Sequence, residues 1–159
     1  MLEYHVIPVV VIHKNYRWVE YERKVILFPV GSHKEFINII NATVLLAKML
    51  DATVHLYSVH KKGQEWSEGM KSNIELSKKI FEENHIFYKR IIEEQAVYSV
   101  GYSKQILLYA EKVKADFIAI MSNQSDEYYY IADNDKEMLL TNEQGIPVLC
   151  ANEKTRELS

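Results

Sequence analysis

Short apolar runs alternate with longer amphipathic segments through most of the chain, and this alternation limits the possible folds more than any other feature. Helix-like segments separate five apolar runs, which fall at residues 24–30, 53–59, 86–94, 115–122 and 146–151. Strands and helices in this order and at this spacing require a parallel sheet with helices on both faces. The sequence therefore predicts an open, doubly wound α/β fold.

Individual residues predict where the helices begin, end and face the core. Ser32 and Glu35 have the spacing of a capping box, so a helix is expected to follow them and to run to about Leu50. Asn84 is placed to end a second helix in a left-handed conformation. A last helix is expected over about residues 133–142. One face of the second helix should be buried, and it consists of Met70, Ile74, Ser77 and Phe81.

The bulk properties describe one globular domain and exclude several classes of function. A chain of 159 residues, 48% hydrophobic and 26% charged, is long enough to close a single core. A net charge of −3 gives no reason to expect binding to nucleic acid, and no apolar run is long enough to span a membrane. The single cysteine, Cys150, reads as a small buried hydrophobe, and a reducing cytoplasm is the expected compartment.

The chain resembles the universal stress protein family over residues 23–152. Four pieces carry the resemblance through their order and spacing: KVILFPVGS (24–32), LLAKMLDATVHLYSV (45–59), AEKVKADFIAIMS (110–122) and GIPVLC (145–150). The resemblance implies a five-stranded parallel sheet in the order 3-2-1-4-5 with helices on both sides. It also implies that domains pair through the last strand.

One branch of that family binds ATP through an acidic residue after the first strand and a G-x2-G-x9-G-[ST] loop after the fourth. Such glycines let backbone N–H groups approach phosphates. This sequence lacks the acidic residue and the three glycines, and its loop carries carboxylates that repel phosphate. We therefore expect neither ATP binding nor another cofactor. The candidates for a degenerate pocket are Val30, Gly31, Ser32, Ser122, Asn123, Ser125, Asn134 and Asp135.

Other chemistry has little support in the sequence. The six histidines form no H-x3-H or H-E-x2-H pattern, so no metal site is expected. No nucleophile elbow or Cys–His arrangement is present, so no catalytic residues and no enzymatic activity are expected. The tyrosine-rich stretch at residues 127–130 could stack on a ligand, or it could simply cover the carboxyl end of the sheet.

These observations favour a non-enzymatic binding or regulatory module that lacks the ATP-binding loop. A second hypothesis is a domain that binds another small ligand in the crevice above the first and fourth strands, where open α/β sheets place ligands. A third is the cytosolic regulatory tail of a membrane transporter.

The sequence near the two ends is nearly the same, with IPVVVI at residues 7–12 and IPVLCA at residues 146–151. We expect residues 6–12 to form an extra strand antiparallel to residues 147–151, because an uncovered edge strand is an aggregation hazard. Pro8 and Pro147 should lie at the strand beginnings, where a missing N–H costs least.

The resemblance suggests an origin for this extra strand. Tandem family members join two domains by a linker that follows a last strand, and residues 13–23 read as such a linker. The chain could then be the second half of a tandem protein, or the strand could be an ordinary N-terminal extension. We expect residues 1–23 to be the edge strand and linker, residues 24–152 the domain, and residues 153–159 a polar tail. The partner of the last strand would be the N-terminal strand, a second such domain or a homodimer mate.

Overall fold

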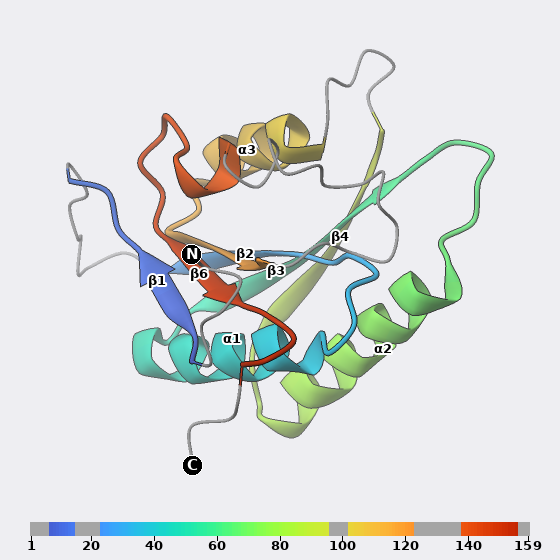
Figure 1. Ribbon diagram of the computed structural model, residues 1–159, viewed down its shortest axis with the longest axis horizontal. Helices are drawn as coiled ribbons and strands as arrows, with labels where there is room; N and C mark the ends of the chain where they lie inside the picture. Colours follow the sequence, from blue (N-terminus) through green and yellow to red (C-terminus); the bar gives the residue numbers. More distant parts are fainter. Residues whose placement is uncertain (1–6, 15–22, 96–101, 123–137, 156–159) are drawn as a thin grey trace.

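The computed structural model describes residues 7–14, 23–95, 102–122 and 138–155 (Figure 1). Within them, a six-stranded sheet has the order β1-β6-β5-β2-β3-β4. β1 pairs with β6 antiparallel, and all the other neighbouring pairs are parallel. The strands are β1 (Val9–Val11), β2 (Val25–Pro29), β3 (Thr53–His60), β4 (Tyr88–Glu94), β5 (Phe117–Met121) and β6 (Val148–Ala151).

Helices cover both faces of this sheet, so the predicted α/β class is confirmed. α1 (Ile37–Leu50) and α2 (Glu68–Glu83) pack on one face, and α3 (Tyr102–Val113) packs on the other (Figure 1). β5 is buried at every residue, whereas every residue of β4, at the sheet edge, is half-buried or exposed. Each face therefore has its own apolar core, and the central strands contribute to both.

The edge beside β6 is covered by the chain's own N-terminal segment. β1 pairs with β6 in the register Val9↔Cys150, Val10↔Leu149 and Val11↔Val148, so the predicted antiparallel pairing is confirmed. Pro8 and Pro147 directly precede the two strands, as expected. β1 is shorter than the predicted strand because it starts after Pro8 and stops before Ile12, which is 62% exposed.

The predicted capping box at Ser32 and Glu35 is wrong. α1 begins at Ile37, and Phe36 occupies its N-cap position without a side-chain hydrogen bond. Glu35 has a φ of 54°, which is incompatible with an N-terminal helical turn. The chain instead makes a turn after β2 before the helix starts, and that turn forms part of the pocket described below.

The second helix buries the predicted face, because Met70, Ile74, Ser77 and Phe81 are all buried. Its predicted C-terminus is wrong by one residue: Asn84 has a φ of −98°, and the left-handed residue is His85, with a φ of 57°. The Asn84 side chain instead donates a hydrogen bond to the carbonyl of Ile80, which closes the last turn.

The last predicted helix lies mostly outside the described residues. Residues 138–140 are helical and Asn142 is not, while residues 133–137 lie outside the described ranges. Among the helices that the structure does describe, none has the length and hydropathy needed to cross a bilayer.

Candidate functional site

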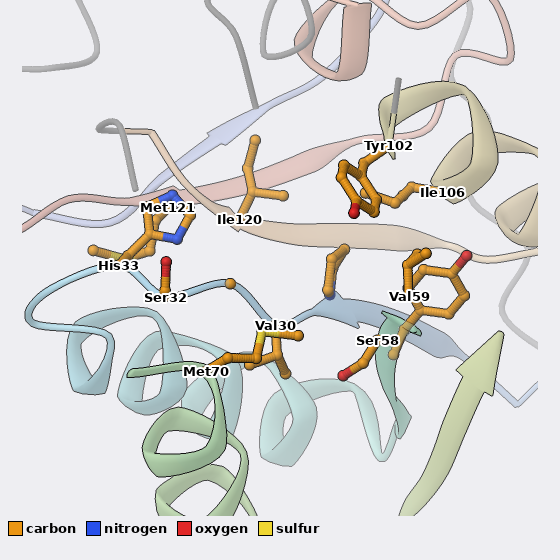
Figure 2. Close-up of a pocket in the computed structure, with 13 residues that line it drawn as sticks. Val30, Ser32, His33, Ser58, Val59, Met70, Tyr102, Ile106, Ile120 and Met121 are labelled. Carbon is orange, nitrogen blue, oxygen red and sulfur yellow. The ribbon is translucent and has the colours of Figure 1, made fainter. Parts of the chain in front are cut away.

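A pocket of about 50 Å³ lies at the carboxyl ends of β2, β3 and β5 (Figure 2). In open α/β sheets this is where ligands bind, because neighbouring strands connect to helices on opposite faces there. The wall is mainly apolar, with Val30, Val59, Met70, Ile106, Ile120 and Met121. The remaining lining residues are Pro29, Gly31, Ser32, His33, Tyr57, Ser58 and Tyr102.

The turn after β2 forms one side of the pocket and is held in place from α2. Asn73 donates through Nδ2 to the carbonyl of Gly31 at 2.8 Å and to that of His33 at 3.0 Å. A Cβ atom at Gly31 would lie 2.8 Å from Nδ1 of the buried His33 ring, so only glycine fits there without a shift. The turn is thereby fixed by its own side-chain packing as well as by Asn73.

The end of β3 forms the opposite side of the pocket and is also anchored by side chains. Trp66 donates through Nε1 to the carbonyl of Val59 at 3.1 Å. Arg90 lies over the Trp66 ring, 5.5 Å from its centroid, and donates to the carbonyl of Leu56. These contacts place the pocket on a rigid part of the sheet, which is the setting for a preorganised binding site.

The polar groups of β3 differ in whether they already have partners. Tyr57 donates its hydroxyl to Oε1 of Glu93 at 2.7 Å, and burial together with that carboxylate raises its pKa. His55 shares a hydrogen bond with the Tyr109 hydroxyl at 2.7 Å. Burial, with the nearby Lys89 charge, lowers the pKa of His55. The buried hydroxyl of Ser58, in contrast, has no hydrogen-bond partner among the described residues.

The lining of the pocket favours uncharged groups. Lys, Arg, Asp and Glu are all absent from the described residues that line it, so no fixed charge there would balance a phosphate or an ammonium group. Across the described ranges, no group of three or more His, Cys, Asp or Glu side chains is arranged to hold a metal ion. The site can hold an apolar part of a ligand and make a small number of hydrogen bonds to a polar atom of the same ligand.

The predicted site residues divide into three sets. Val30, Gly31 and Ser32 lie in the pocket wall. Ser122 lies outside that wall, because its hydroxyl donates to the carbonyl of Ala151 at 3.3 Å and so faces β6. The others lie outside the described residues and are Asn123, Ser125, Asn134 and Asp135.

Sequence reasoning missed the residues that come from other elements. Ser58 is read as one more residue of a buried strand, and Met70 as one more residue of a helix face. One signal was available for Ser58: it is a small polar residue at the carboxyl end of a strand that is buried at seven of its eight positions. Polar residues at strand ends of this kind point to a crevice.

Comparisons with known proteins identify the fold. No protein-family model and no curated protein matches the chain. Among solved structures, a universal stress protein from Archaeoglobus fulgidus DSM 4304 aligns with a TM-score of 0.64 and 15% identity, over 95% of this chain and 51% of that one.

Two further structures were solved with nucleotides. The universal stress protein from Archaeoglobus fulgidus in complex with dAMP aligns with a TM-score of 0.55 and 16% identity, over 80% of this chain and 96% of that one. A universal stress protein in complex with cAMP aligns with a TM-score of 0.58 and 9% identity, over 82% of this chain and 98% of that one. Identities this low describe architecture alone, and on that basis the chain has the universal stress protein fold.

Proposed function

We propose that this protein is a non-enzymatic binding or regulatory module whose pocket at the ends of β2, β3 and β5 holds a small uncharged ligand. The observation that carries the proposal is the pocket wall: it is mainly apolar, it has no Lys, Arg, Asp or Glu among the described lining residues, and it sits on anchored strand ends. A binding role without catalysis needs no more than this. The sequence supports this proposal, because it contains no recognisable nucleophile–base motif.

The neighbours with dAMP and cAMP suggest which ligands to try first. Both nucleotides combine an uncharged nucleoside with a phosphate. In this chain Val30 follows β2 where the ATP-binding branch has an acidic residue, and the glycines of the phosphate loop are absent from the sequence. We therefore propose that the nucleoside portion binds at the mouth of the pocket with only a few of its atoms inside, and that the phosphates contribute little affinity.

Native mass spectrometry of the purified protein tests this function directly. A small molecule retained at one per chain, released on denaturation and free of phosphate, is the expected result. A retained nucleoside triphosphate would contradict the proposal. So would a protein that retains nothing and binds no member of a panel of nucleosides and other small neutral compounds.

We also propose that the chain corresponds to one half of a tandem protein whose domains meet through their last strands. Two observations support this. The segment IPVVVI (7–12), which contains β1, resembles IPVLCA (146–151), which contains β6, and the two strands pair antiparallel. The alignment to the longer Archaeoglobus protein covers 95% of this chain but 51% of that one. Sequencing the genomic region upstream of Met1 tests the idea: an in-frame α/β domain is expected, and an unrelated or absent coding sequence would refute it.

A further inference from the structure

Ser58 stands out among the pocket residues because its hydroxyl is buried and has no partner. The residue is 1% exposed, and no hydrogen-bond partner for its Oγ is found among the described residues. Ser58 lies on the α1–α2 side of β3, with Val30 and Met70 beside it in the pocket wall (Figure 2). Its neighbours Tyr57 and Val59 face the α3 side, as the alternation of a strand requires.

An unpaired buried hydroxyl is unfavourable, and other buried serines in this chain avoid it. Ser77 in α2 donates its hydroxyl to the carbonyl of Asn73 at 2.6 Å, and Ser122 donates to the carbonyl of Ala151. Buried polar groups without a partner are uncommon in native proteins and usually have a specific explanation. For Ser58 the pocket itself offers one, since a bound ligand can supply the missing partner.

The pocket also limits the ligand group that meets Ser58. A water occupies about 10–15 Å³ of such a volume, so the pocket of about 50 Å³ holds a group of only a few heavy atoms. The Tyr57 hydroxyl is already bonded to Glu93. The described wall contains no Lys, Arg, Asp or Glu that would balance a charge, which favours an uncharged group.

We infer that Ser58 is the specificity-determining residue of this pocket, and that it hydrogen-bonds an uncharged polar group of the ligand. This inference rests on the proposed function, because it assumes that the pocket binds a small neutral molecule. Adenosine is the probe, as it is the uncharged portion that the proposed function assigns to the site. The Ser58 hydroxyl should strengthen ligand binding but lower the stability of the ligand-free protein. Replacing it should therefore weaken binding and raise the melting temperature without ligand.

The test compares the full chain with two variants, Ser58→Ala and Thr43→Val. Thr43 is the matched control, because its hydroxyl in α1 is also buried without a partner but lies outside the pocket wall. Adenosine and AMP are titrated into each protein by calorimetry, and melting temperatures are measured without ligand. A purely structural Ser58 would lower the melting temperature when replaced, whereas an unpaired hydroxyl kept for a ligand would not.

We expect Ser58→Ala to weaken adenosine binding by about tenfold, the effect of one lost hydrogen bond, and to raise the melting temperature by about 2–4 °C. Thr43→Val should leave adenosine affinity unchanged. Full-chain affinity for AMP should not exceed that for adenosine. Equal adenosine affinity in Ser58→Ala and the full chain would overturn the inference, as would a lower melting temperature of that variant.

If the full chain binds neither probe, the inference is also overturned, while the proposed function is judged separately by the retained molecule in native mass spectrometry. If a neutral molecule is retained equally by Ser58→Ala and the full chain, the proposed function stands and the role of Ser58 is refuted. The two proposals can therefore fail independently.

Discussion

Deleting residues 1–13 should leave the domain able to fold but make it associate through the bared edge of β6. This deletion removes β1 and with it the three pairs Val9↔Cys150, Val10↔Leu149 and Val11↔Val148. β6 is buried along its whole length in the intact chain. Without β1, a row of backbone N–H and C=O groups on β6 would lack partners, which is the condition that promotes edge-to-edge pairing.

The magnitudes show why the effect should appear in association more than in stability. Three paired residues supply on the order of two to four ladder hydrogen bonds, each worth about 0.5–1.5 kcal/mol net. Half-burying Val9 and Val11 adds about 1 kcal/mol each, since full burial is worth about 1.5–3 kcal/mol. Ordering the backbone costs about 1–2 kcal/mol per residue and offsets most of this gain. We therefore expect the deletion to lower the free energy of unfolding by no more than about 3 kcal/mol.

Sedimentation velocity over a range of concentrations measures the association. The shortened chain should gain mass with concentration more steeply than the full chain. A synthetic peptide of residues 5–14, added in trans, should suppress that gain, and a peptide with the same residues in reversed order should not. A shortened chain with the same mass and solubility as the full chain at every concentration would refute the edge argument.

Three further predictions follow from single contacts. Gly31→Ala should lower the free energy of unfolding by about 1–3 kcal/mol in denaturant titrations, because its Cβ would lie 2.8 Å from the His33 ring. Gly69→Ala, whose Cβ would lie 3.5 Å from its nearest neighbour, should be neutral or stabilising, and equal losses would refute the reasoning. Cys150 should react slowly with thiol reagents, because burial raises its pKa to about 12, and fast labelling without denaturant would contradict this. The free energy of unfolding should fall as the pH drops below about 6.5, because burial lowers the pKa of His55 in the folded chain and the unfolded chain then binds the proton more readily. His55→Gln should make this pH dependence less steep. An unchanged pH dependence in that variant would contradict the reasoning.

The parts of the fold that follow from hydrophobic pattern could be predicted, and those that depend on local backbone geometry could not. The buried face of α2 and the pairing of residues 9–11 with β6 follow from the spacing of apolar residues and from the need to cover an edge. The capping-box prediction was wrong because Ser32 and Glu35 belong to a turn, which Asn73 of α2 holds in place by a side-chain hydrogen bond. Such a contact spans 42 positions and leaves no local signal.

The candidate site divides in the same way. Val30, Gly31 and Ser32 could be predicted because the carboxyl end of a central strand is a fixed place in this architecture. Met70 and Tyr102 could not, because each comes from the first turns of a different helix, and the crossover connections bring them to the pocket. The unpaired state of Ser58 is a property of its surroundings, so it becomes visible only in three dimensions.

Calorimetry with Mg-ATP and adenosine, titrated into the same preparation of the full chain, tests the central claim most directly. The claim is that this pocket binds an uncharged ligand, since no Lys or Arg is found in its described wall and the loop glycines are absent from the sequence. We predict that adenosine binds and that Mg-ATP shows no micromolar affinity. Micromolar binding of Mg-ATP, tighter than that of adenosine, would contradict the account.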